Sequence, residues 1–165
     1  MKADKLYLVG FMGAGKSTVA RALGRRTGWR VEDIDERIEA REHRTVAAIF
    51  GQQGEAHFRH LERMELGELV SARHVVVATG GGTFVEADNR ALMLADGVVA
   101  WLDLPLAGVL ERVPVDGRRP LAADRAQMEQ LFTRRQLAYA HAHVRVDASR
   151  PVEEIVGRLL EWIDF

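Results

Sequence analysis

Three stretches of the chain are apolar runs without alternation, at residues 5–10, 74–82 and 96–104. Such runs are typical of strands buried on both faces of a parallel sheet. Two further strands are expected at residues 29–33 and 143–149. Between the strands, apolar residues recur at helical spacing, and this pattern predicts helices at residues 16–27, 35–42, 45–53, 54–72, 125–142 and 151–163.

This alternation of strands and helices predicts an α/β fold in which helices cover both faces of a parallel sheet. A polar loop with proline and glycine occupies residues 113–124. The face that helix 54–72 turns to the core is expected to include Phe58, Leu61, Leu69 and either Met64 or Glu65. No linker divides the 165 residues, so we expect a single domain over residues 1–165.

Composition and charge narrow the class of protein. Apolar residues make up 47% and charged residues 28%, which is a globular balance, and the net charge of −1 does not indicate a polyanion binder. The chain has no cysteine, which excludes disulfides and thiolate metal sites. Its first apolar run is too short for a signal peptide or a membrane span. We therefore expect a cytoplasmic protein without a nucleic-acid or membrane partner.

The stretch GFMGAGKST, residues 10–18, fits the phosphate-loop pattern G-x-x-x-x-G-K-[ST] and lies between a predicted strand and a predicted helix. Glycines in such a loop let backbone N–H groups surround phosphate oxygens at the positive end of the following helix. Lys16 is expected to reach the β- and γ-phosphates and Ser17 to ligate Mg²⁺. The pattern predicts binding of a nucleoside triphosphate with Mg²⁺ by Gly13, Ala14, Gly15, Lys16, Ser17 and Thr18.

Two carboxylates, Asp33 and Asp35, follow the second predicted strand. Asp33 with Glu36 three residues later has the pattern of a helix N-cap, whereas a carboxylate near an ATP γ-phosphate can hold metal or orient an acceptor hydroxyl. Asp103 is a second candidate for the metal, because it ends an apolar strand as the metal-binding aspartate of many phosphate-loop enzymes does. A GTPase switch is not expected, because the chain has neither N-K-x-D nor D-x-x-G.

Five further stretches follow the phosphate loop in order: VEDIDERIE, IFGQQGEAHFRHLE, ATGGGT, GRRPL and RRQLAY. Together they resemble the shikimate kinase family, from Tyr7 to about Trp162. The resemblance implies a three-layer phosphate-loop kinase fold, with a five-stranded parallel sheet in the order 2-3-1-4-5 and a lid loop. It implies a monomer that transfers a phosphoryl group from ATP, with Mg²⁺, to the 3-hydroxyl of shikimate. The products would be 3-phosphoshikimate and ADP, in chorismate and aromatic amino-acid biosynthesis.

The resemblance also implies roles for single residues. Asp33 would hold Mg²⁺ with Ser17, which leaves Asp103 without a metal, and Asp35 would grip the hydroxyl that is phosphorylated. The acceptor carboxylate would be bound by two arginines, which suit it because a guanidinium can form two parallel hydrogen bonds. The acceptor-binding residues implied are Asp35, Arg59, Gly80, Gly81, Gly82 and Arg135, within and beyond a substrate-binding region at about residues 33–62.

Some of these assignments have neighbours that compete for them. Arg134 adjoins Arg135, and the proline usual in the family between this arginine and the following tyrosine is absent, but the spacing from arginine to tyrosine favours Arg135. Glu62 is expected to orient Arg59, since the two residues lie one helical turn apart. The aromatic side chains of Phe50 and Phe58 would either wall the acceptor pocket or pack in the core.

Loop 113–124 matches the lid of the family. Arg119, with Arg118 as its competitor, would reach the phosphates and stabilise the charge on the transferring group, while closure excludes water. Arg112 and Arg150 would lie on the two sides of the adenine. The implied catalytic set is therefore Lys16, Asp35 and Arg119.

Two other functions remain open from the sequence. A kinase of another small metabolite, such as gluconate or a nucleoside monophosphate, would keep the ATP site and change the acceptor. A kinase-like domain that binds without turnover would be expected to have lost some of the charged residues of the motifs, yet all of them are present.

Overall fold

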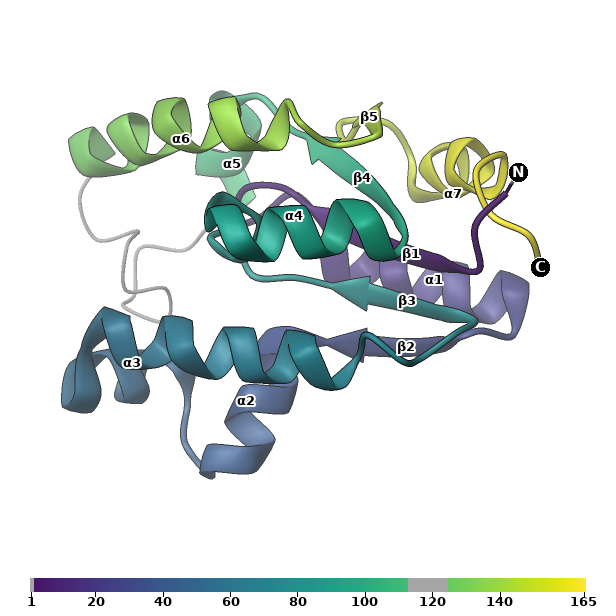
Figure 1. Ribbon diagram of the computed structural model, residues 1–165. Coiled ribbons are helices and arrows are strands. Elements are labelled where there is room, and N and C mark those ends of the chain that lie inside the picture. Colours follow the sequence, from purple (N-terminus) through teal and green to yellow (C-terminus); the bar gives the residue numbers. More distant parts are fainter. Residues whose placement is uncertain (1, 113–124) are drawn as a thin grey trace.

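The structure is a computed structural model, and it describes residues 2–112 and 125–165. Its centre is a parallel sheet in the order β2-β3-β1-β4-β5 (Figure 1), as predicted. The strands are β1 (Lys5–Val9), β2 (Arg30–Asp33), β3 (Val75–Ala78), β4 (Val98–Asp103) and β5 (Val144–Asp147). In the central register, Leu8 of β1 lies between Ala78 of β3 and Ala100 of β4.

Helices cover both faces of this sheet, so β1 and β3 are buried along their whole length. On one face α1 (Lys16–Thr27) packs against the strands and against α7 (Val152–Leu160). Figure 1 shows α4 (Ala87–Asp96) on the opposite face. Further elements along the chain are a short 3₁₀ helix, η1 (Thr83–Val85), and the helices α5 (Leu106–Arg112) and α6 (Arg125–Tyr139).

Two helices, α4 and the short α5, were not among those that the pattern of apolar residues predicted. In α4 the N-cap residue, Glu86, makes no capping hydrogen bond with its side chain. Its apolar residues are consecutive at positions 91–95, where Met93 is buried and Leu92 and Leu94 pack against the core, so they do not recur at the helical spacing on which the prediction depends.

Helices α2 (Ile34–Glu42) and α3 (Val46–Glu68) are held together by buried charge. Of the two residues that the sequence left as alternatives for the core-facing side of α3, Glu65 is buried and Met64 is exposed. The Glu65 carboxylate accepts from Nε of Arg37 and pairs with Nε of Arg41 on α2, each at 2.8 Å. These contacts fix α2, which carries Asp35, against α3, which carries Arg59.

Gly54 interrupts α3 with a φ of 84°, where a helix would need a negative angle. The break lies at the boundary between the two helices predicted at residues 45–53 and 54–72. It separates the turn that carries Phe50 from the longer segment that carries Arg59.

The N-terminal end of β1 is fixed by Lys5, whose side chain is fully buried. Its ammonium group donates to the carbonyls of Leu69 and Val70, at the end of α3, and to Asp96, at the end of α4. A buried ammonium is stable only when its donors are satisfied, so these contacts pin both helix ends to the sheet. Within the described parts of the chain, no helix is both long and apolar enough to cross a membrane.

Candidate active site

The phosphate loop lies between β1 and α1, and its glycines have the backbone angles that the sequence pattern requires. Gly10, Gly13 and Gly15 have φ values of 147°, 78° and 94°, which residues with a Cβ atom rarely adopt. A Cβ on Gly10 would also lie 2.6 Å from the carbonyl oxygen of Leu102 on β4. The Lys16 ammonium donates to the carbonyls of Gly10 and Phe11, at 2.7 and 3.0 Å.

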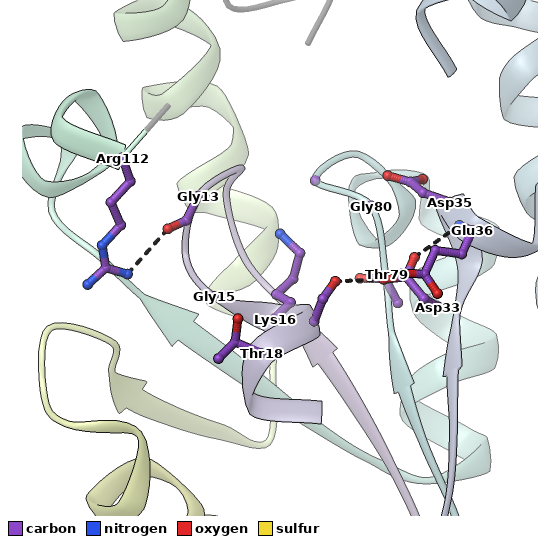
Figure 2. Close-up of a pocket in the computed structure, with 12 residues that line it drawn as sticks. Gly13, Gly15, Lys16, Thr18, Asp33, Asp35, Glu36, Thr79, Gly80 and Arg112 are labelled. Atoms are coloured by element: carbon purple, nitrogen blue, oxygen red, sulfur yellow. Dashed lines mark hydrogen bonds between the residues drawn. The ribbon is translucent and has the colours of Figure 1, made fainter. Parts of the chain in front are cut away.

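A cavity of about 410 Å³ opens beside this loop, where the carboxyl ends of β1, β2 and β3 meet. In Figure 2 the loop and Arg112 form one side, and the start of α2 and the turn after β3 form the other. Ligands of open α/β sheets bind at this edge of the strands. The lining residues are Gly13, Gly15, Lys16, Ser17, Thr18, Asp33, Asp35, Glu36, Thr79, Gly80, Gly81 and Arg112.

Asp33 caps α2, as its sequence pattern predicts, and also contacts Ser17 of the phosphate loop. One carboxylate oxygen accepts from the backbone N–H of Glu36 at 3.2 Å and caps α2, while the other accepts from the Ser17 hydroxyl at 2.6 Å. The second contact brings together a hydroxyl and a carboxylate at the edge of the cavity, and oxygen donors of this kind suit Mg²⁺. Asp103 does not line this cavity. Its carboxylate accepts a hydrogen bond from Nε of Arg145 on β5 at 2.8 Å.

Asp35 is half-buried, and the hydrogen bonding of its carboxylate is incomplete. Its Oδ1 atom is shielded from solvent and makes no hydrogen bond with any described residue. Burial, followed by the negative charges of Glu62 and Asp33, raises the pKa of Asp35 to about 7, against the opposing charge of Lys16. In Figure 2 this carboxylate points toward Gly80. A buried acceptor without a partner is costly to a folded protein, and a ligand hydroxyl would satisfy it.

The three glycines after β3 provide room for charged side chains of the site. None of them has a left-handed φ, so the backbone itself does not require glycine there. A Cβ on Gly80 would lie 2.9 Å from Oδ1 of Asp35, and one on Gly81 would lie 2.7 Å from Nη1 of Arg135. A Cβ on Gly82 would lie 2.5–2.6 Å from three guanidinium atoms of Arg59. Each glycine therefore admits one charged group to the turn.

Arg59 and Glu62 form the pair that their helical spacing predicts. Nη1 of Arg59 donates to Oε1 of Glu62 at 2.6 Å, and Glu62 is fully buried. Nη2 of Arg59 donates to the exposed Glu55 at 3.2 Å. The ring of Phe58 lies 5.4 Å from the Arg59 guanidinium carbon and 4.8 Å from the ring of Phe50, so Phe58 both packs in the core and supports the arginine.

Arg135, and not Arg134, faces the glycine turn. Arg135 is buried with its guanidinium 5.8 Å from the Phe11 ring, whereas Arg134 is exposed. Burial lowers the pKa of Arg135, and no described carboxylate lies within ion-pair distance of it. One helical turn later, the Tyr139 hydroxyl donates to the carbonyl of Gly81. Two guanidinium groups thus approach one turn, an arrangement suited to a carboxylate ligand.

The remaining predicted site residues divide into three groups. Nη1 of Arg112 donates to the Gly13 carbonyl at 3.3 Å, on the phosphate side of the cavity. Arg150 does not line this cavity; it donates to Glu154 at 2.9 Å beside a separate cavity of about 270 Å³. Arg118 and Arg119 lie outside the described residues.

Four residues of the site went unrecognised in the sequence. Thr79 and Glu36 line the cavity, Thr83 donates to Glu62, and Tyr139 donates to Gly81. Each lies next to a motif residue or one helical turn from one. Their neighbourhood was therefore visible in the sequence, but the contacts that they make were not.

Replacing Asp35 with asparagine should stabilise the ligand-free protein in a pH-dependent way. Between about pH 4 and 7, the folded carboxyl group keeps a proton that the unfolded chain has lost, so the free energy of unfolding of the wild type falls as pH rises. The advantage of Asp35→Asn should grow over that range to at most about 4 kcal/mol and stay constant above it. Urea unfolding at pH 4.5, 6 and 8 measures it.

The exposed Asp164→Asn is the matched control and should show no such growth. An Asp35→Asn variant whose advantage does not change with pH would contradict the environment described for this carboxylate.

Comparisons with known proteins identify relatives of this chain. A family model described as shikimate kinase matches residues 12–164. The shikimate kinase of Persephonella marina is 40% identical over 160 residues, which are 93% of this chain and 98% of that protein. For the shikimate kinase of Sulfurihydrogenibium sp., the identity is 41% over 160 residues, with coverages of 93% and 96%.

Solved structures are similar to this chain as well. The structure of shikimate kinase from Acinetobacter baumannii in complex with shikimate superposes with a TM-score of 0.91 at 34% identity, over 96% of this chain and 92% of that one. A sugar kinase from Janibacter sp., 16% identical with a TM-score of 0.64, shares the fold alone. Because the family model and the curated relatives span nearly all of the sequence, the chain belongs to the shikimate kinase family.

Proposed function

We propose that this protein transfers the γ-phosphoryl group of ATP to the 3-hydroxyl of shikimate, giving 3-phosphoshikimate and ADP. The observation that carries the proposal is the buried Oδ1 atom of Asp35, which lacks a hydrogen-bond partner among the described residues and lies in the same cavity as the phosphate loop. The membership of the family and the shikimate complex of the Acinetobacter relative support the choice of acceptor.

On the acceptor side, charge and space suit a small hydroxylated acid. Arg59 and Arg135 approach the turn Gly80–Gly81–Gly82 and would bind the acceptor carboxylate. Asp35 would orient the hydroxyl and accept its proton as the new bond forms, which suits a group whose pKa is close to the pH of the cell. Fixing the acceptor at both ends would supply much of the rate enhancement through orientation.

On the nucleotide side, the amides of Gly13, Ala14 and Gly15 would bind phosphate oxygens, with Lys16 and Thr18 beside them. Ser17 and Asp33 are the residues that would hold Mg²⁺, which supplies positive charge for the phosphate oxygens when bound. Arg112 lies on the phosphate side of the cavity, and Arg150 is assigned to the adenine from the family resemblance alone.

The wider proposal follows the family. Arg119, in the lid at residues 113–124, would reach the transferring group and complete the catalytic set with Lys16 and Asp35. The protein would act as a single-domain monomer in the cytoplasm, with no nucleic-acid partner. Its substrate-binding region would extend over about residues 33–62.

The direct test is ADP release from MgATP by the purified protein, with shikimate, gluconate or AMP as acceptor. Strong stimulation by shikimate alone is expected, because gluconate lacks the ring that the pocket would enclose and AMP carries a phosphate. Lys16→Ala should abolish nearly all turnover. Asp35→Asn should still bind ATP, but its kcat should be greatly reduced. ATP binding without stimulation by shikimate, or stimulation by a control acceptor instead, would overturn the proposed acceptor.

Gly82→Ala should raise the KM for shikimate, since the added methyl group would occupy space now taken by the Arg59 guanidinium. The loss of a charge-assisted pair predicts a change on the order of tenfold or more. The KM for ATP should stay within about twofold, because Gly82 does not line the phosphate side of the cavity. Steady-state kinetics with each substrate varied in turn measures both.

Gly67→Ala is the matched control. Gly67 lies in α3, and a Cβ added there would meet no atom within 4 Å, so this substitution should leave both KM values unchanged. If Gly82→Ala behaves like Gly67→Ala, the close contact with Arg59 does not matter for acceptor binding.

A further inference from the structure

Four groups form a closed ring of contacts behind the glycine turn. The Thr83 hydroxyl donates to Oε2 of Glu62 at 2.6 Å, and Oε1 of Glu62 accepts from Arg59 at 2.6 Å. The Arg59 guanidinium lies in turn against Gly82, the residue before Thr83. Two consecutive residues therefore act on the same arginine: Gly82 makes room for it, and Thr83 reaches it through Glu62.

The burial of Glu62 makes the Thr83 contact important. Glu62 has no exposed surface, so both carboxylate oxygens must find donors within the protein. Arg59 satisfies one oxygen, and Thr83, which is also fully buried, satisfies the other. Without the hydroxyl, Oε2 of Glu62 would face Gly80 and the like charge of Asp35.

Thr83 is itself held firmly, which allows it to define a position. Its backbone N–H donates to the carbonyl of Gly80 at 3.3 Å, and its own carbonyl accepts from the side chain of the buried Asn89 on α4 at 3.1 Å. The hydroxyl is thus carried by the turn that would bind the acceptor and is braced from α4. A side chain fixed in this way can select one position of the Glu62 carboxylate.

We propose that Thr83 is a positioning residue of the acceptor site, whose hydroxyl fixes Glu62 so that the Arg59 guanidinium is held over Gly82. The inference rests on the proposed function, because it assigns Arg59 to the acceptor carboxylate. Thr83 touches neither substrate in this account, and its effect passes through Glu62 to acceptor binding alone.

The test compares Thr83→Val, which removes the hydroxyl at nearly constant volume, with Thr83→Ser, which keeps it. We expect Thr83→Val to raise the KM for shikimate about tenfold, with the KM for ATP within about twofold of the wild type. Thr83→Ser should restore the KM for shikimate to within about twofold of the wild type. If the valine variant does not fold, Thr83→Ala replaces it with the same expectation.

The control is Thr27→Val, which removes a hydroxyl bonded to the Leu23 carbonyl at the end of α1, and it should change neither KM. An unchanged KM for shikimate in Thr83→Val, or a parallel rise of both KM values, would overturn the inference. The valine and serine variants behaving alike would overturn it too. A wild type that does not phosphorylate shikimate would instead refute the proposed function, and this inference with it.

Discussion

The site depends on one constraint: one oxygen of the half-buried Asp35 carboxylate is shielded from solvent and makes no hydrogen bond with any described residue. Asp35 follows the cap residue of α2 by two positions, so the end of β2 and the start of α2 determine where it lies. Glu62 and Asp33 add negative charge around it, and Lys16 is the positive group that opposes them. A ligand-free protein gains nothing from this arrangement, because burial without a partner favours the protonated form. The arrangement becomes favourable when a hydroxyl group and a phosphate chain enter the cavity.

Ion pairs between the neighbouring helices fix the position of the Asp35 carboxylate relative to Arg59. Glu65 binds two arginines of α2 and ties that helix to α3, and Glu62, three residues earlier on α3, binds Arg59. The glycine turn then admits one charged group at each of its three positions. Buried ion pairs of this kind add little net stability, but they fix geometry, which is what an acceptor site needs.

Much of the fold was predictable, because β1, β3 and β4 are apolar without alternation and the helices between them mostly carry apolar stripes. Helices α4 and α5 were not predicted; in α4 the apolar residues are consecutive at positions 91–95 and do not recur at helical spacing. The phosphate loop, the Arg59–Glu62 pair and the cap at Asp33 follow from local spacing, so the sequence was sufficient for them. The spacing from arginine to tyrosine already favoured Arg135 over Arg134, and in the structure the packing against Phe11 and Gly81 distinguishes the two side chains.

The remaining features depend on contacts between distant segments. Thr83 and Glu62 are separated by 21 positions, and the raised pKa of Asp35 comes from burial and from charges on three elements. The number of glycines in the turn was visible in the sequence, whereas the side chains that require each of them became visible only in the structure.

The central claim is that desolvation and neighbouring negative charges raise the pKa of the half-buried Asp35 before the acceptor hydroxyl binds. An NMR titration of the ligand-free protein, labelled with ¹³C at aspartate carboxyl groups and assigned with Asp35→Asn, measures this environment directly. The account predicts that the Asp35 resonance titrates near pH 7. A titration near the ordinary value for aspartate, about 4, would contradict it.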